Sequence, residues 1–264
     1  MKRTPTSHLP SDLPHEIAAF LANAPLYDSS CSQEAKVYFV DRNGGYYLKR
    51  APRHTLTREA EMAAYFHQKG LAPEVLFFAT AEEADFLLTR AAVGEDLTHE
   101  AYLSDPQRLC DTLAETLRHL HETDFSDCPV KDRMTAYCAL AEENYAKGKF
   151  DLSLFPDGSQ YSFADANEAY RVFRAGKGAF TSDVLLHGDY CLPNVMFDGW
   201  RFSAFIDLGN GGVGDRHVDL FWGAWTLFYN LKTDKYCARF LDAYGRDLVN
   251  EDVLKTVAAA EIFG

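Results

Sequence analysis

The chain has no long run of apolar residues, although 47% of its 264 residues are hydrophobic. No window approaches the roughly 20 apolar residues that a membrane-spanning helix needs, so we expect no membrane partner. The first thirty residues carry acids and prolines, so we expect no signal peptide and a cytoplasmic location. Neither G-x-G-x-x-G nor G-x-x-x-x-G-K-S/T occurs, which removes the usual glycine-rich signatures of nucleotide binding.

Cysteines and basic residues are also few. The six cysteines form no C-x-x-C pair and no metal-ligand spacing, so we expect reduced thiols. Lys and Arg total 26 against 39 Asp and Glu, giving a net charge of -13. Nucleic acids attract basic surfaces, so this balance argues against nucleic acid and favours a cationic small substrate. An acidic surface also serves solubility alone, and composition leaves both interpretations open.

The patterns along the chain predict two lobes of different composition. Two β-rich runs, 35–40 and 46–49, are joined by a turn containing Asn43-Gly44 and predict a hairpin. Around it we expect a leading helix over 14–22, a helix over 57–69 that begins at Thr57 as N-cap and stops at Gly70, and strands over 74–79 and 85–89. Beyond Asp105-Pro106 the pattern is helical, with Leu109, Leu113, Leu117 and Leu120 on one face, and it continues over 131–148, 164–175 and 215–262. We therefore predict an α+β protein with a small antiparallel sheet lobe over 1–92 and a larger, mainly helical lobe over 93–264.

The densest set of functional side chains lies in His187-Gly-Asp-Tyr-Cys-Leu-Pro-Asn194 and Phe205-Ile-Asp-Leu-Gly209. A carboxylate at Asp189 can orient a hydroxyl group for attack on phosphorus. Asn194 and Asp207 offer a neutral and a charged oxygen to Mg²⁺ on nucleotide phosphates. Each residue alone would more often cap a turn or end a strand, but the combined spacing is specific and predicts phosphoryl transfer.

Three further features support this interpretation to different degrees. Lys49 on the second run of the hairpin can hold phosphates if Glu59, ten residues later, fixes its ammonium group. The polar stretch containing Ser30 and Ser32 offers hydroxyl and N–H groups to phosphates, and it is equally consistent with an ordinary connector. Asp219, at the start of a helix, is expected to accept N–H bonds from the turn that carries Asp189, which is a structural role.

These segments, with Gly214-Asp-Arg-His-Val-Asp219, closely resemble the aminoglycoside 3'-phosphotransferases, which are antibiotic-resistance kinases with a protein-kinase-like fold. The resemblance implies ATP as phosphate donor, with GTP possible, Mg²⁺ as metal and a cationic aminoglycoside such as kanamycin or neomycin as acceptor. It implies that Asp189 is catalytic, that Asn194 and Asp207 bind Mg²⁺, that Lys49 contacts phosphates and that Glu59 holds Lys49. It also implies that Tyr47 stacks on adenine, that the backbone from Arg90 to Ala92 binds the base, and that Asp157, Asp189 and Glu261 face the drug. For the oligomeric state we expect a monomer or a weak homodimer.

The chain departs from the family pattern at three places. It has Asn210 where an arginine is common. It ends in Glu261-Ile-Phe-Gly264 rather than in two acids and a terminal phenylalanine. Its substrate loop lacks a dense cluster of acids, because Asp151, Asp157 and Asp165 are spread apart. These departures concern the range of drugs. Two alternatives stay open: a kinase of another small hydroxylated antibiotic or metabolite, and a silent nucleotide-binding module, which we would expect to lack Asp189, Asn194 or Lys49.

Overall fold

The computed structural model describes residues 3–7, 9–31, 35–155 and 159–264. The contacts divide the chain into two units, Met1–Asp96 with Val195–Gly209, and Leu97–Asn194 with Asn210–Gly264. The predicted lobes, 1–92 and 93–264, assign the segment 195–209 differently. This segment joins unit 1 because its hairpin pairs with a strand just before Leu97. The functional division into a nucleotide-binding and a catalytic lobe stays a prediction.

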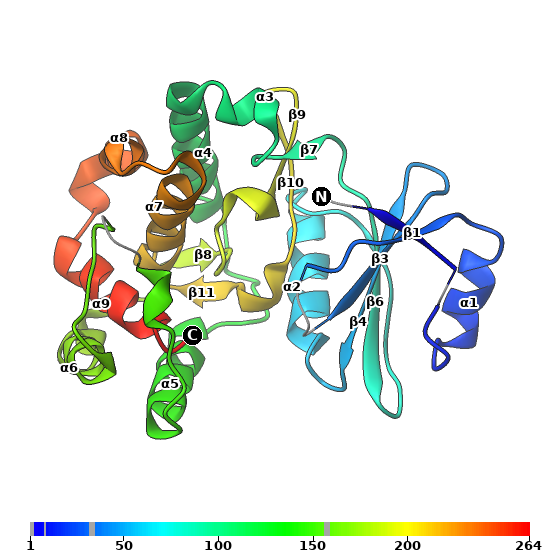
Figure 1. Cartoon of the computed structure of the whole chain (residues 1–264), viewed down its shortest axis with the longest axis horizontal. Helices are drawn as coiled ribbons and strands as arrows, with labels where there is room; N and C mark the ends of the chain where they lie inside the picture. The colour runs from blue at the N-terminus through cyan, green and yellow to red at the C-terminus, as the bar shows by residue number, and fades with distance from the viewer. Residues whose placement is uncertain (1–2, 8, 32–34, 156–158) are drawn as a thin grey trace. The chain divides into compact units, whose positions relative to one another are not determined.

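Unit 1 is built on a six-stranded antiparallel sheet with the strand order β1-β2-β3-β4-β6-β5 (Figure 1). Its strands are β1 (Thr4–Thr6), β2 (Leu26–Asp28), β3 (Lys36–Val40), β4 (Tyr46–Pro52), β5 (Val75–Thr80) and β6 (Ala84–Arg90). The predicted hairpin is β3–β4, and Asn43, Gly44 and Gly45 take the positive φ that its turn requires. A second sheet has the order β10-β9-β7, from β7 (Glu95–Asp96), β9 (Val195–Asp198) and β10 (Arg201–Phe205).

The two faces of the larger sheet bury different residues, because successive side chains of a strand point to opposite sides. Tyr46 and Leu48 of β4 pack with α1 (His15–Leu21). Ala51 packs on the other face with Leu56 and α2 (Thr57–Gln68), and the two helices lie on opposite faces in Figure 1. The two-residue period therefore places Tyr47 and Lys49 on the α2 face.

The start of α2 differs from the prediction. Thr57 is the first helical residue and Leu56 is the N-cap, without a side-chain cap. The buried Asp85 of β6 supplies the missing acceptor, because its Oδ2 takes the Leu56 N–H at 2.9 Å. A helix start can thus be capped from a distant strand, which sequence patterns do not show. The helix stops before Gly70, as predicted, where φ is +73°.

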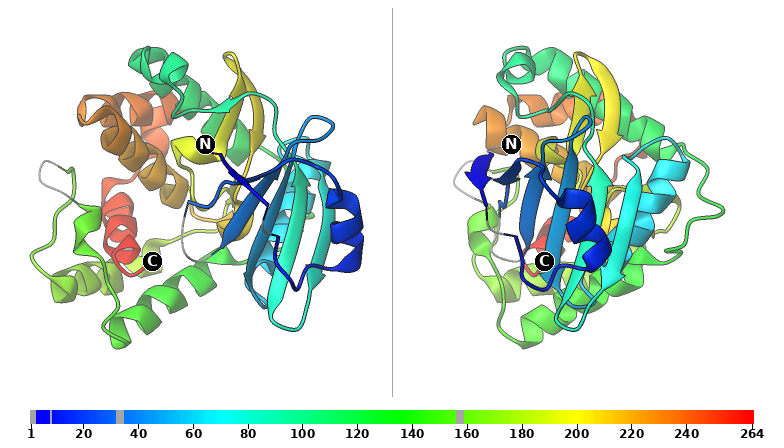
Figure 2. Two further views of the ribbon diagram at one scale, coloured as in Figure 1. Left: turned by 45° about the vertical axis from the view of Figure 1, so that its right-hand side comes forward. Right: turned by 90° about the vertical axis from the view of Figure 1, so that its right-hand side faces the viewer.

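Unit 2 is mainly helical. It contains α3 (Glu100–Leu103), α4 (Pro106–His121), α5 (Arg133–Ala146), α6 (Ala166–Gly176), α7 (His217–Leu231), α8 (Lys235–Gly245) and α9 (Glu251–Glu261), with a two-stranded sheet of β8 (Val184–Leu186) and β11 (Gly212–Gly214). Helix α4 packs on α7 and α8, and α9 packs on α6 and α7; the orange α7 and α8 are visible in Figure 2. The four leucines predicted to share one face of α4 are fully buried.

The remaining short elements are 3₁₀ turns: η1 (Leu152–Leu154), η2 (Lys177–Ala179), η3 (Leu192–Asn194), η4 (Leu208–Asn210) and η5 (Arg246–Leu248). Of these, η3 ends where the chain passes from unit 2 to unit 1, and η4 contains the point where it returns to unit 2. Within the described ranges, no helix has both the length and the apolar character that a membrane span requires.

Candidate active site

Lys49 is fixed by two carboxylates within unit 1. Its Nζ lies 2.9 and 2.8 Å from the two oxygens of Glu59 on α2, and 3.0 Å from Oδ1 of Asp207. The Lys49 side chain is about one-quarter exposed, whereas the Asp207 side chain is half exposed. The predicted pairing of Glu59 with Lys49 is therefore present in the structure, and Asp207 is a second partner that the sequence did not indicate.

The charges of this cluster are interdependent. Burial acts to lower the pKa of Lys49, but the carboxylates of Asp207 and Glu59 outweigh it and hold the pKa above its ordinary value. Burial raises the pKa of Glu59, while Lys49 acts in the opposite direction. Lys49 therefore stays a cation at neutral pH, as a contact to phosphate oxygens requires.

Asp207 has an unusual backbone conformation. Its φ is +57°, a left-handed value that costs non-glycine residues energy and that aspartate tolerates better than most. Only its Oδ1 has a partner among the described residues, namely Lys49. Because the other oxygen is uncommitted and half of the side chain is exposed, Asp207 can accept a hard cation.

Asp189 and Asn194 contact each other in unit 2. The Asn194 Nδ2 donates to the Asp189 carbonyl oxygen at 3.0 Å and to its Oδ2 at 2.8 Å. This orientation leaves Oδ1 of Asn194 without a donor in the described part of the chain, so the oxygen remains available as a metal ligand. Buried hydrogen bonds fix the segment between them. The Tyr190 hydroxyl donates to the Leu113 carbonyl oxygen at 2.7 Å, and the Leu192 N–H donates to Thr226 Oγ1 at 3.2 Å.

Asp219 holds the turn before Asp189, as the sequence predicted. Its buried carboxylate accepts the N–H groups of His187 at 2.8 Å and of Gly188 at 2.7 Å. Its Oδ2 also lies 3.1 Å from Nε2 of His121, whose Nδ1 is 2.8 Å from the Tyr244 hydroxyl. The backbone that presents Asp189 is therefore tied to a polar network with no exposure to solvent at its centre.

Gly188 has no room for a side chain. Its φ is +84°, and a Cβ atom would lie 2.0 Å from the carbonyl oxygen of Asn210. We expect Gly188→Ala to lower the free energy of unfolding by about 2–4 kcal/mol, through this clash and the left-handed backbone. Urea denaturation measures the loss. Gly148→Ala is the matched control, because Gly148 has φ +66° with nothing within 4 Å of the added atom, so only the backbone cost applies. Equal losses in the two variants would contradict the steric argument.

Glu261 at the end of α9 lies in electrostatic range of Asp189 within unit 2. Burial raises its pKa to about 7; bonds from Tyr137 and Trp222 oppose the rise and the charge of Asp189 adds to it. The Tyr137 hydroxyl donates to Glu261 Oε1 at 2.9 Å. Two of the three acids predicted to face the drug thus belong to unit 2 and influence each other electrostatically.

Other predicted residues are engaged within unit 1. The Ser30 side chain accepts the Val37 N–H at 3.0 Å and bonds to the Asp28 carboxylate, so its hydrogen bonds stabilise the loop in which it lies. The Arg90 N–H donates to the Glu74 carbonyl at 2.9 Å, and the Ala91 N–H to the Gly45 carbonyl at 3.0 Å. Among the backbone N–H groups of residues 90–92, only that of Ala92 has no acceptor in the described chain. It is therefore the N–H group that could donate to a nucleotide base.

Two predicted residues, Ser32 and Asp157, lie outside the described residues. The two other acids noted in the substrate loop have structural roles. Asp151 accepts the Ser153 N–H at the start of η1, and Asp165 accepts the Glu168 N–H at the start of α6. In the ranges that the structure describes, no three His, Cys, Asp or Glu side chains form a metal cluster.

Asp215, four residues before Asp219, faces neither a cleft nor solvent. It is 1% exposed and accepts the N–H groups of Thr181 at 2.8 Å and of His217 at 2.9 Å. Its Oδ1 also lies 2.6 Å from Nδ1 of His217, whose Nε2 accepts the Asn250 N–H. Asp215 therefore joins three segments of unit 2 and has a structural role.

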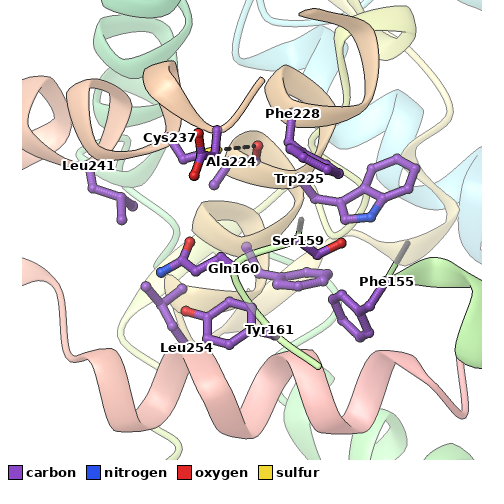
Figure 3. Close-up of a pocket in the computed structure, with 12 residues that line it drawn as sticks. Phe155, Ser159, Gln160, Tyr161, Ala224, Trp225, Phe228, Cys237, Leu241 and Leu254 are labelled. Carbon is purple, nitrogen blue, oxygen red and sulfur yellow. Dashed lines mark hydrogen bonds between the residues drawn. The ribbon is translucent and has the colours of Figure 1, made fainter. Parts of the chain in front are cut away.

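A pocket in unit 2 is lined mainly by aromatic and apolar side chains. Its space is about 430 Å³, including the part open to solvent. Figure 3 shows rings of Phe155, Tyr161 and Trp225 around it, and among the described residues of its lining the only charged side chain is Asp234. Because charge-assisted bonds to carboxylates hold ammonium groups most strongly, the acids Glu261 and Asp189 are the better candidates for the substrate.

Sequence patterns did not identify two residues of α5 that donate hydrogen bonds to Asn210 and to Glu261. Arg133 of α5 donates to both the carbonyl oxygen and the side-chain oxygen of Asn210, each at 3.0 Å. Tyr137, one turn later on the same helix, donates to Glu261. Their spacing of four residues, which places them on one helix face, was the available signal.

Comparisons with solved structures establish the fold. The structure superposes on the crystal structure of aminoglycoside-3'-phosphotransferase of type VIII with a TM-score of 0.76, over 94% of this chain and 97% of that chain, at 24% sequence identity. It also matches aminoglycoside phosphotransferase APH(3'')-Id from Streptomyces rimosus ATCC10970 with a TM-score of 0.75, over 93% of this chain and 96% of that one, at 21% identity. The fold is therefore the α+β, protein-kinase-like fold, as the sequence predicted.

The model of the phosphotransferase enzyme family matches residues 30–255. A probable aminoglycoside 3'-phosphotransferase of Lactococcus lactis is 47% identical over 251 residues, which cover 95% of each chain. An aminoglycoside 3'-phosphotransferase of Niallia circulans is 32% identical, over 83% of this chain and 84% of that relative. The chain belongs to the phosphotransferase enzyme family.

Proposed function

We propose that the protein is an ATP-dependent O-phosphotransferase that moves the γ-phosphate to a hydroxyl group, the 3'-hydroxyl, of an aminoglycoside antibiotic such as kanamycin or neomycin. The observation that carries the proposal is the turn that presents Asp189: Asn194 donates to its carboxylate, and the buried Asp219 accepts the N–H groups of the preceding residues. A carboxylate able to activate a hydroxyl group is thus held in a fixed direction, and Glu261 in the same unit would bind an ammonium group of the drug. Relatives with 47% and 32% identity bear the same activity in their names.

The nucleotide side of the proposal rests on unit 1. Lys49, held by Glu59, would contact phosphate oxygens, and Tyr47 on the same sheet face would stack on the base. Crystal structures of more distant members of this fold contain ADP or AMP-PNP. The uncommitted oxygen of Asp207 in unit 1 suits a hard divalent cation, and so does that of Asn194 in unit 2, so each residue would serve as a Mg²⁺ ligand. When bound, the ion offsets negative charge on the phosphates.

Asp189 would act on the acceptor hydroxyl. The hydroxyl oxygen forms a bond to the γ-phosphorus while the bond from that phosphorus to the ADP oxygen breaks, and the hydroxyl proton passes to the Asp189 carboxylate. The bond from Asn194 to Oδ2 of Asp189 fixes the direction of this carboxylate. The product carries added negative charge, which weakens binding of a polycationic drug to RNA. Resistance would follow.

The pKa of Glu261 predicts how substrate binding depends on pH. Glu261 is largely neutral below its pKa of about 7 and charged above it. We therefore expect the KM for a cationic aminoglycoside to fall as the pH rises from 6 to 8. In Glu261→Gln the KM should be raised at pH 8 and this part of the pH dependence lost. Steady-state kinetics of both proteins over this range measure the difference. Parallel profiles would show that Glu261 does not contact the drug, because titration of the drug's own amines affects both proteins alike.

A direct assay tests the proposed function. The purified protein is mixed with ATP, Mg²⁺ and kanamycin, neomycin, streptomycin or a panel of other small alcohols, and phosphorylated products are identified by mass spectrometry and NMR. The expected product is the 3'-phosphate of kanamycin, and GTP in place of ATP tests donor choice. Growth of a susceptible bacterium that expresses the chain, beside an Asp189→Ala strain, tests resistance. Transfer to other alcohols but not to aminoglycosides would reject the proposal in favour of a different small-molecule kinase.

A further inference from the structure

Arg3 lies over the aromatic residues on the Lys49 face of the large sheet. It directly precedes β1, which pairs with β2 at the sheet edge. Its guanidinium carbon is 3.5 Å from the centre of the Phe39 ring, and its Nη2 donates to the Tyr47 hydroxyl at 2.9 Å. The arginine therefore reaches from the edge strand across β2 and β3 to β4.

The rings beneath Arg3 form a row on one sheet face. Tyr27, Phe39 and Tyr47 are direct neighbours on β2, β3 and β4. The ring centres are 6.1 Å apart for Tyr27 and Phe39, and 5.3 Å for Phe39 and Tyr47. Lys49 follows Tyr47 by two residues and shares this face. The row thus leads from the edge strand to the lysine expected to bind phosphates.

We propose that Arg3 is a positioning residue for the nucleotide, which acts by holding the Tyr47 ring in the orientation that receives the base. The Tyr47 side chain is constrained at its hydroxyl by Arg3 and at its ring by Phe39. A ring that is already ordered loses less conformational freedom when a base stacks on it, so binding is tighter. The guanidinium stays over Phe39 because a cation is attracted to the face of an aromatic ring. This inference rests on the proposed function, since it takes Tyr47 as the residue that stacks on the base.

The test is calorimetric titration of ADP and AMP-PNP, with Mg²⁺, into the full-length protein and its variants. We expect Arg3→Ala to raise the nucleotide Kd by about three- to tenfold. Arg3→Lys should restore part of the affinity, because it keeps a donor and a cation. In a Tyr47→Phe background, where no hydroxyl is present to be held, Arg3→Ala should change the Kd by less than about twofold. The KM for the aminoglycoside should be unchanged.

Arg42→Ala is the matched control. Arg42 is also an exposed arginine of unit 1, with its guanidinium carbon 5.9 Å from the centre of the Phe20 ring and a bond to the Phe20 carbonyl oxygen. Its removal should leave the nucleotide Kd unaltered. An unchanged Kd in Arg3→Ala would overturn the inference. Tighter binding in Arg3→Ala would also overturn it, because Arg3 would then compete with the base. So would an equal loss of nucleotide affinity on Arg3→Ala in the Tyr47→Phe background.

The titration also separates this inference from the proposed function. Because it requires binding and no turnover, the role of Arg3 is measured even if the wild-type protein phosphorylates none of the alcohols supplied. Nucleotide binding without transfer to aminoglycosides rejects the proposed substrate only. Nucleotide binding that is indifferent to Arg3 rejects the inference only. A wild-type protein that binds no nucleotide rejects both.

Discussion

Asp189→Asn is expected to lower kcat for aminoglycoside phosphorylation by about 10²- to 10⁴-fold, because an amide cannot take the proton of the acceptor hydroxyl. The substitution keeps the size of the side chain. Its oxygen can still accept the 2.8 Å bond from Nδ2 of Asn194, so the turn should keep its conformation. The Kd for ADP should change little, since Lys49 and Tyr47 are untouched. Steady-state kinetics and nucleotide titration of the same preparation measure both effects.

Glu115→Gln provides the control for the loss of one carboxylate. Glu115 is exposed on α4 in the same unit, and we expect the variant to retain wild-type kcat. If Asp189→Asn kept more than about one-tenth of the wild-type kcat, general base catalysis by Asp189 would be excluded. If it instead lost nucleotide binding, Asp189 would act on the nucleotide and the proposed division of roles would be wrong.

The sequence predicted those parts of the fold that depend on local patterns. Helix α4 follows from Asp105-Pro106 and the buried leucines, and the Asp105 side chain accepts the Arg108 N–H as an N-cap should. The β3–β4 hairpin follows from Asn43-Gly44. The contact between Lys49 and Glu59 was predicted because a strand lysine and a helix glutamate recur in phosphate sites.

The features that were missed depend on contacts between distant segments. Asp85 caps α2 from another strand, and residues 195–209 join unit 1 because β9 pairs with β7. The burial of Asp215 depends on Thr181 and His217, and only the three-dimensional structure brings Thr181 to it. Periodicity reports which face of an element is apolar, and it does not report which partner covers that face.

The departure at Asn210 illustrates the same limit. From the sequence, this residue only marks the absence of a common arginine. In the structure, Arg133 of α5 brings a guanidinium group to Asn210 by donating to its backbone and side-chain oxygens. The same Asn210 carbonyl is the atom that leaves no room for a side chain at Gly188. Asn210, which the sequence linked only to the range of drugs, thus also determines the packing around the turn of Asp189.

Asp219→Ala is expected to destabilise the protein by about 3–5 kcal/mol, the usual cost of removing one partner from a buried charged network. The N–H groups of His187 and Gly188 would lose their acceptor, and His121 would lose the carboxylate beside Nε2. Water cannot replace the carboxylate readily, because Asp219 has no exposure to solvent. Urea denaturation measures the loss of stability. Asp234→Ala is the control, since Asp234 is exposed before α8 and makes no side-chain cap.

The same substitution should also lower kcat of the protein that remains folded, by about 10²-fold, because displacement of a catalytic group by about 1 Å has an effect of this size. Asp219→Asn should lie between the wild type and Asp219→Ala, since its one carbonyl oxygen can accept from His187 or Gly188 but its amide nitrogen cannot accept from the other. The nucleotide Kd measured without Mg²⁺ should be unchanged in both variants, because Lys49 and its partners belong to unit 1. A folded Asp219→Ala protein with wild-type kcat would show that the turn positions Asp189 without this carboxylate, and the buried network would then contribute to stability alone.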